Sequence, residues 1–255
     1  MYNTITKQDF LKKLNLGDDY SISGFLVFGG FKKYYYELLK QSALKIDPNA
    51  TFRQLPDEFI NPILEFKLNG KNYWFAIAYG GALLCEWLHV ACSLGSKQNI
   101  ILGSLGGLVE QGSTRDLVIP EYSFANESTT RAYDPQANNK HYANPELRKR
   151  LFDLLEDKHR IWQGPTITHE AMLAETWEDI QRWSKEGYYG VEMEAATVFA
   201  VSKFFKVPSA AILRISDNLI QKKTVFDVAH ENGAELKKKL HEDMFDAALQ
   251  VLFNK

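Results

Sequence analysis

Two glutamates stand close together in an otherwise apolar stretch of the chain. The segment GVEMEAATVF places Glu192 and Glu194 on either side of Met193, and the apolar run continues to Phe205. If this run is helical from Val191 onward, residues two apart lie on nearly opposite sides, so one acid faces the buried stripe. A buried carboxylate needs a partner such as a ligand hydroxyl or a basic group. The alternative is two ordinary first-turn glutamates, which the helix dipole favours.

Two glycine-rich turns follow predicted strands. FLVFGGFKK runs into Gly29 and Gly30, with Lys32 and Lys33 directly after, and NIILGSLGGL runs into a turn that holds Ser104. Glycines allow a ligand to approach the backbone, and exposed N–H groups beside a basic residue suit an anion. Each turn alone is commonly only a turn, and neither matches a P-loop or a dinucleotide fingerprint.

A third predicted strand ends on polar residues. AILRISDNL places Ser216, Asp217 and Asn218 after a buried run, which predicts a carboxylate at the edge of a sheet. The alternative is an Asx turn or a helix cap. The six histidines show no pair at ligand spacing, and His169-Glu170 lacks the second histidine of a zincin motif, so no metal is predicted. No G-x-S-x-G nucleophile elbow occurs either.

Short apolar runs alternate with helical patterns along the chain. We predict strands over Ile22 to Phe28, Tyr73 to Tyr79, Ile100 to Leu102, Asp116 to Ile119, Gly164 to Ile167 and Ala210 to Ile215. We predict helices over Leu83 to Leu94, Pro145 to Lys158, Thr176 to Lys185, Ala195 to Phe205 and Ala234 to Phe253. This alternation indicates an α/β fold with a central mixed β-sheet flanked by helices. Residues 1–255 contain no repeat or linker and are predicted to form a single domain, with ligands beyond the carboxyl ends of the strands.

Composition narrows the class of partner. A formal net charge of -2 gives no electrostatic case for nucleic acid or a membrane surface, so a small molecule or a protein is expected. The apolar span from Tyr73 to Gly95 carries Glu86 and His89, which argues against a membrane helix. The polar start of the chain has no signal-peptide pattern, and two cysteines make no disulfide framework. A cytoplasmic location is expected.

Taken in order, these motifs resemble the nucleoside phosphorylase and nucleosidase superfamily. The resemblance rests on a glycine turn after the first strand, GSLGGL followed by DLVIP, GVEMEAATVFA, and a strand that ends in SDN. GVEMEAA is the most specific of these. The superfamily includes purine nucleoside phosphorylases, uridine phosphorylases and nucleosidases of the methylthioadenosine or AMP type. The resemblance implies an enzyme, a homo-oligomer such as a dimer or hexamer, and no cofactor beyond phosphate as co-substrate.

The resemblance also implies roles for individual residues. Glu194 would bind the ribose 2′ and 3′ hydroxyls, Met193 would pack against the sugar, and Glu192 would orient both. Asp217 would protonate the leaving base as a general acid. The remaining implied contacts are Gly29, Gly30, Lys33 and Ser104 on phosphate, and Gly106 and Val191 on the base.

Two departures leave the nucleophile open. One phosphate arginine of the family corresponds to Lys33, and a second falls on Ile101, which is apolar. Uracil-cleaving members read the base with a Gln-x-Arg pair, which TITHEAMLAET lacks, so a purine is favoured. The leading hypothesis is phosphorolysis of a purine nucleoside to the free base and ribose 1-phosphate. The alternatives are a nucleosidase that uses water and a non-catalytic nucleoside-binding member.

Overall fold

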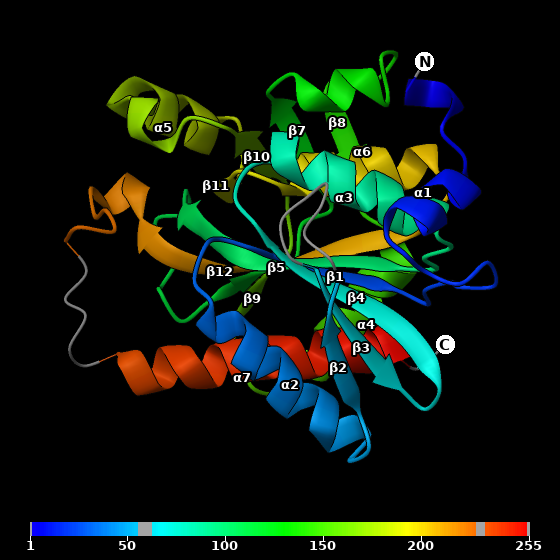
Figure 1. Cartoon of the computed structure of the whole chain (residues 1–255). Coiled ribbons are helices and arrows are strands. Elements are labelled where there is room, and N and C mark those ends of the chain that lie inside the picture. The colour runs from blue at the N-terminus through cyan, green and yellow to red at the C-terminus, as the bar shows by residue number, and fades with distance from the viewer. Residues whose placement is uncertain (1, 56–62, 228–232, 254–255) are drawn as a thin grey trace.

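A single mixed β-sheet forms the centre of the molecule in the computed structural model, which describes residues 2–55, 63–227 and 233–253 (Figure 1). The strands of this part of the chain are β1 (Phe25–Gly29), β2 (Thr51–Gln54), β3 (Leu64–Leu68), β4 (Lys71–Ala78), β5 (Asn99–Gly107), β6 (Leu117–Val118), β7 (Tyr122–Asn126), β8 (Lys140–Tyr142), β9 (Ile161–Trp162), β10 (Thr166–His169), β11 (Gly190–Glu192) and β12 (Ser209–Asn218). The α-helices are α1 (Lys7–Lys13), α2 (Tyr34–Ile46), α3 (Gly81–Ser93), α4 (Pro145–Leu155), α5 (Trp177–Lys185), α6 (Ala195–Phe204) and α7 (Ala234–Phe253). The predicted fold class is confirmed.

Strand β5 is the branch point of the sheet. The strand order is β2-β3-β4-β1-β5-β11-β10-β7-β8, and β12 pairs with β5 and β6 off this path. β1 and β12 run parallel to β5, whereas β11 runs antiparallel to it. The carboxyl ends of β1, β5 and β12 therefore meet at one edge of the sheet, where ligands of α/β proteins bind.

Alternate side chains of the central strands pack into two hydrophobic clusters, one on each face of the sheet. Ile101 and its equivalents on β1 and β12 join one cluster with side chains of α3 and α6. Ile100, Leu102 and Ile212 join a second cluster with side chains of α2, α4 and α7. Figure 1 shows these helices on opposite sides of the sheet. This two-residue alternation decides which helix layer each side chain at the carboxyl edge faces.

Local sequence explains where the helices begin. Asn144 accepts a hydrogen bond from the backbone N–H of Leu147, with Pro145 at the first helical position of α4. Thr176 and Asp179 form a capping box at the start of α5. No helix among the described residues combines the length and the apolar character needed to cross a membrane.

Candidate active site

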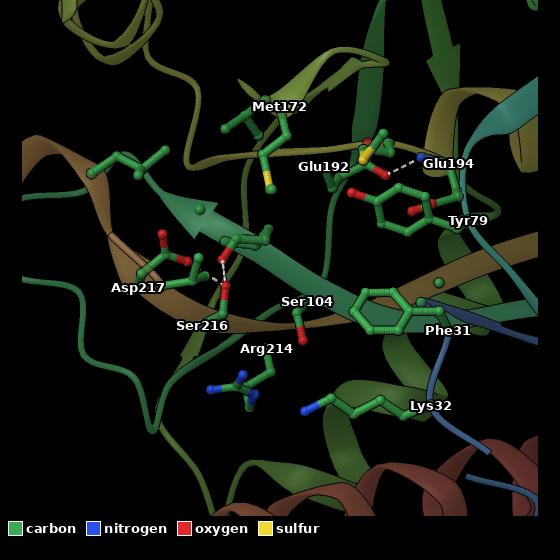
Figure 2. A pocket seen from close by; sticks show the side chains of 18 of the residues that line it. Phe31, Lys32, Tyr79, Ser104, Met172, Glu192, Glu194, Arg214, Ser216 and Asp217 are labelled. Atoms are coloured by element: carbon green, nitrogen blue, oxygen red, sulfur yellow. Dashed lines mark hydrogen bonds between the residues drawn. The ribbon is translucent and has the colours of Figure 1, made fainter. Parts of the chain in front are cut away.

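A cavity of about 340 Å³ lies at the carboxyl ends of β1, β5 and β12. Its lining comes from segments far apart in the sequence: Gly29, Gly30, Phe31, Lys32, Tyr35, Tyr79, Ser104, Leu105, Gly106, Met172, Glu175, Val191, Glu192, Met193, Glu194, Arg214, Ser216, Asp217, Leu219, Val225 and Lys237. The cavity thus brings together the sequence-predicted residues, with the exception of Lys33. Figure 2 shows Glu192 and Glu194 on one side and Asp217 on another, with Arg214 and Lys32 facing the same space below Ser104.

Glu194 is the buried carboxylate of one cavity wall. It is the N-cap residue of α6, it is 5% exposed, and its Oε1 accepts a hydrogen bond of 2.7 Å from the backbone N–H of Gly80. A Cβ on Gly29 would lie 2.8 Å from Oε2 of Glu194, so only glycine allows this approach. Burial, reinforced by the charge of Glu192, raises the pKa of Glu194 to about 8. The arrangement suits a carboxylate that gains hydroxyl donors from a ligand.

Glu192 holds the start of α6 in place. Its Oε2 accepts hydrogen bonds from the backbone N–H groups of Glu194 and Ala195, at 2.7 and 2.6 Å. Its Oε1 accepts from the hydroxyls of Ser123, at 3.0 Å, and Thr168. Burial raises the pKa of Glu192, and these four donors oppose that rise. Glu192 is therefore a positioning residue for Glu194.

The predicted helix Ala195 to Phe205 is confirmed to within one residue, but the conditional case of a helix that begins at Val191 does not hold. Val191 and Glu192 end strand β11, and α6 begins only at Ala195. The two acids are thus not on opposite sides of a helix. Both are buried because Glu192 uses the unpaired N–H groups at the helix start, which leaves Glu194 to face the cavity.

Asp217 lies at the end of the cavity opposite Glu194 (Figure 2). The pairing of β12 with β5 shifts between Ile215 and Asp217, so this bulge lets both Ser216 and Asp217 line the cavity. The Ser216 hydroxyl donates to Oδ1 of Asp217. Burial raises the pKa of Asp217, while Ser216 and the charge of Arg214 act against the rise. A raised pKa favours a carboxyl that delivers a proton.

A second acid near Asp217, Glu175, was not predicted from the sequence. Glu175 lines the cavity together with Met172 and Leu219 and is half-buried. Burial and the neighbouring charges of Asp217 and Asp179 raise the pKa of Glu175 to about 7. Its place among polar residues before α5 carries no signal in the sequence, because a glutamate there is typical of a solvated helix start.

A basic wall lies between the Glu194 end and the Asp217 end of the cavity (Figure 2), and it differs from the predicted one. Lys32 and Lys33 are both exposed, but only Lys32 lines the cavity, and Lys33 is the N-cap residue of α2. The backbone N–H of Gly30 donates to the Ala78 carbonyl at 2.7 Å, so Gly30 contributes space rather than a donor. Ser104 keeps its predicted place.

Arg214 and Lys237 complete this wall, and sequence reasoning missed both. The sequence did contain a signal for Arg214, because a lone arginine inside the apolar strand AAILRI needs a partner that compensates its buried charge. Nothing in the sequence singles out Lys237 among three consecutive lysines. Arg131, considered at first as an anion ligand, is exposed on the 3-10 helix Thr129–Ala132 and does not line the cavity.

The described residues contain no cluster of three histidine, cysteine, aspartate or glutamate side chains that could hold a metal ion. The cavity offers three chemical features: a wall with the carboxylate of Glu194, an end with the carboxyl of Asp217, and a wall of basic side chains.

Comparison with known proteins gives relatives that share one name, purine nucleoside phosphorylase DeoD-type. The purine nucleoside phosphorylase DeoD-type of Clostridium beijerinckii is 26% identical over 167 residues, which cover 63% of this chain and 65% of the relative. The same type of protein from Clostridium perfringens (strain SM101 / Type A) is 28% identical over 158 residues, which cover 62% of this chain and 66% of the relative. The matches thus span roughly two thirds of the relatives' length.

Solved structures share the fold over nearly the whole chain. The crystal structure of uridine phosphorylase from Vibrio fischeri ES114 has a TM-score of 0.70 at 19% identity and covers 91% of both chains. A structure of the same enzyme complexed with 6-hydroxy-1-naphthoic acid has a TM-score of 0.72 at 17% identity and covers 94% of this chain and 93% of the other. The family model described as "Phosphorylase superfamily" matches residues 82–248, which include Glu192, Glu194 and Asp217. This chain belongs to the phosphorylase superfamily.

Proposed function

We propose that this protein is a nucleoside phosphorylase that transfers the ribosyl group of a purine nucleoside to inorganic phosphate. The observation that carries the proposal is the arrangement of the cavity, where Glu194, Asp217 and a basic wall with Lys32 lie around one space. These three features match the three parts of the reaction, which are the sugar, the leaving base and the anionic nucleophile. No cofactor is needed beyond phosphate as co-substrate.

The proposed reaction replaces one bond at C1′ of the sugar. A phosphate oxygen forms a bond to C1′ while the bond from C1′ to the base nitrogen breaks, and its electron pair goes to the base. Asp217 donates its proton to the base, which makes the base a better leaving group. The ionised Glu194 accepts hydrogen bonds from the 2′ and 3′ hydroxyls and stabilises the positive charge that develops on the sugar. The products are free base and ribose 1-phosphate.

The purine class is supported by two observations. An acid at the base end suits protonation of a purine at N7, and the segment from His169 to Glu175 supplies Met172 and Glu175 rather than an amide and an arginine. The curated relatives named above are purine nucleoside phosphorylases, whereas the similar solved structures are of uridine phosphorylase. Structural similarity at 17–19% identity supports the same fold and does not decide between purine and uracil as the base.

Phosphate rather than water is favoured as the nucleophile by the character of the basic wall. Lys32, Arg214 and Lys237 make no ion pair with a carboxylate of the described residues, so their charge is open to an anion. A nucleosidase needs instead a base that activates water on the side of the sugar opposite the leaving group. The carboxyls of Glu194 and Asp217 already have sugar and base roles in this scheme.

Base release with and without phosphate tests the proposal. The purified protein is incubated with inosine, adenosine, guanosine, methylthioadenosine, AMP and uridine, and the free base and sugar product are separated by chromatography. We expect release from purine nucleosides only when phosphate is present, with formation of ribose 1-phosphate. A Glu194→Ala variant should lose most of this activity while remaining folded. Release without phosphate identifies a nucleosidase, and binding without release identifies a non-catalytic member.

A homo-oligomer is part of the same proposal. Phe31, which lines the cavity, is 73% exposed, and its ring meets that of Tyr79 edge-on at 5.7 Å. Tyr79 also lines the cavity and is 45% exposed. A second copy of the chain that covers these rings would shield the reacting sugar from water.

A further inference from the structure

The basic wall of the cavity is built by two elements that meet on one side of the sheet. In the parallel pairing of β12 with β5, Arg214 lies opposite Ser104. Ile212 and Leu102, two residues earlier on each strand, belong to the core beneath α2 and α7. By the two-residue period of a strand, Arg214 and Ser104 face the same helix layer. Lys237 enters the cavity from that layer, since it lies on α7.

Arg214 is a buried cation with hydrogen-bonding capacity left over. It is 6% exposed, and its Nη1 donates to the carbonyls of Ile215 at 3.0 Å and Thr114 at 3.4 Å. Its Nε has no hydrogen-bond partner. No described carboxylate lies within 4.0 Å of the guanidinium. A guanidinium stays protonated in proteins, and the charge of Asp217 acts on it without an ion pair, so an anion that enters the cavity would compensate this buried charge directly.

Lys237 experiences the same excess of positive charge. Burial, and then the charges of Arg214 and Lys32, lower the pKa of Lys237 to about 8. The charges that act on it come from two elements, namely Arg214 of β12 and Lys32 of the segment after β1. An anion placed among these groups would restore the pKa of Lys237 toward its ordinary value, and Lys237 would take up a proton.

The described side chains directly behind the wall are neutral. His241 of α7 is fully buried, and its Nδ1 shares a hydrogen bond of 2.8 Å with the hydroxyl of Tyr34 on α2. Burial, with the charges of Arg214, Lys237 and Lys32, lowers the pKa of His241 to about 3, so this imidazole is neutral. Burial raises the pKa of Tyr34 and that of its neighbour Tyr35, which keeps both phenols neutral.

We propose that Arg214 and Lys237 are the principal ligands of the phosphate dianion, with the hydroxyl of Ser104 as a third contact; this assignment rests on the phosphorolysis proposed above. The position on β5 at which the family resemblance implied an arginine cannot share this task. Ile101 is fully buried in the core beneath α3 and α6, on the other face of the sheet. The guanidinium is instead provided by the neighbouring strand β12 and supported by a lysine of the last helix.

Direct binding of inorganic phosphate, without nucleoside, tests the assignment. We would titrate phosphate into the protein near pH 8 by calorimetry in two buffers of different ionisation enthalpy, which reports proton uptake. Wild type should bind phosphate with net uptake of a fraction of a proton. Lys237→Met should abolish the uptake and weaken binding by about 30-fold, because a charge-assisted hydrogen bond is lost. Lys238→Met is the matched control, since exposed Lys238 lies next along α7 and pairs with Glu242 at 3.8 Å.

Arg214→Gln provides the second arm. Arg214 also binds two backbone carbonyls, so thermal unfolding is measured alongside, and Arg214→Lys is the variant that keeps the charge if the glutamine variant does not fold. We expect Arg214→Gln to raise the phosphate KM by about 30-fold or more and to leave the nucleoside KM nearly unchanged, with partial recovery in Arg214→Lys.

Wild-type phosphate affinity in both the Lys237 and Arg214 variants would overturn the assignment, as would the absence of phosphate binding to the wild type. The proposed function can fail separately. In that case the wild type releases base without phosphate, whatever the phosphate affinities of the variants.

Discussion

Glu194 is a buried carboxyl with few hydrogen-bond donors around it. The residue is 5% exposed and its carboxyl accepts from the N–H of Gly80, with a smaller backbone contribution from Met193, while four donors serve the adjacent Glu192. The raised pKa of about 8 is the result. Two ribose hydroxyls would supply the missing donors, so a bound nucleoside relieves a cost that the empty protein bears.

The stability of the ligand-free protein should therefore depend on this residue and on pH. The pKa of Glu194 is about 8 in the folded chain, against 4.5 ordinarily, so its contribution to stability is present below pH 4.5 and is lost as pH rises through 8. Glu194→Gln cannot ionise, so its melting temperature relative to wild type should rise between about pH 5 and pH 9. Thermal unfolding at several pH values measures this, with the exposed Glu235→Gln as control. A difference that stays constant with pH would rule the explanation out.

The contribution of Asp217 to the rate of base release should be larger for a base that is a poorer leaving group. Asp217→Asn keeps the size of the side chain but removes its acidic proton, so release of an ordinary purine should fall by more than about tenfold. A 7-methylated purine nucleoside leaves as a neutral base and needs no proton at N7, so its cleavage should be nearly unaffected. Single-turnover base release measures both rates. Equal losses for the two substrates would show that Asp217 does not act as the acid.

At the scale of elements, the site depends on where strands and helices stop. The bulge of β12 turns both Ser216 and Asp217 into the cavity, and the start of α6 at Ala195 fixes Glu194. Apolar runs predicted β1, β4 and β12 to within a few residues, because strands that are buried on both faces give continuous apolar runs. β11 was not predicted, since its three residues are too few to give a strand signal of their own beside the apolar stripe of α6.

Close packing between β1 and α6 gives a prediction at this scale. Gly29→Ala would place a Cβ 2.8 Å from Oε2 of Glu194, so the carboxylate must move away from the position that suits the ribose hydroxyls. We expect the KM of a ribonucleoside to rise by about tenfold or more, with a smaller effect on the 2′-deoxynucleoside, which loses one of the two contacts. Steady-state kinetics on both substrates test this. Gly233→Ala is the control, because a Cβ there meets nothing within 4 Å.

At the scale of the whole molecule, the cavity gathers segments from Gly29 to Lys237. The predicted residues Glu192, Glu194, Asp217 and Ser104 could be found because each belongs to a local motif. Lys237 and Glu175 could not, since their roles depend on how α7 and the segment before α5 are placed by tertiary packing. Sequence alone does not show which of several equivalent lysines or glutamates faces inward.

The exposed rings at the cavity give a prediction about assembly. We expect light scattering to report a mass above the 29.2 kDa of one chain at working concentration. Phe31→Asp should shift the mass toward one chain and raise the nucleoside KM, because a charge replaces an aromatic ring that is 73% exposed. Leu44→Asp, at an exposed residue of α2 that does not line the cavity, serves as the control. A wild-type protein of single-chain mass with full activity would contradict the shared-site proposal.

The pairing of β5 with β12 also has a kinetic consequence. Ser104 and Arg214 are register partners although 110 residues separate them in the chain, and Asp217 lies on the same strand. Contacts between such distant segments close large loops and form late, after the local helices. During refolding, helical circular dichroism should therefore recover before enzymatic activity does. The site is complete only after this long-range pairing has formed, so chains that lack it would be unable to act on a nucleoside.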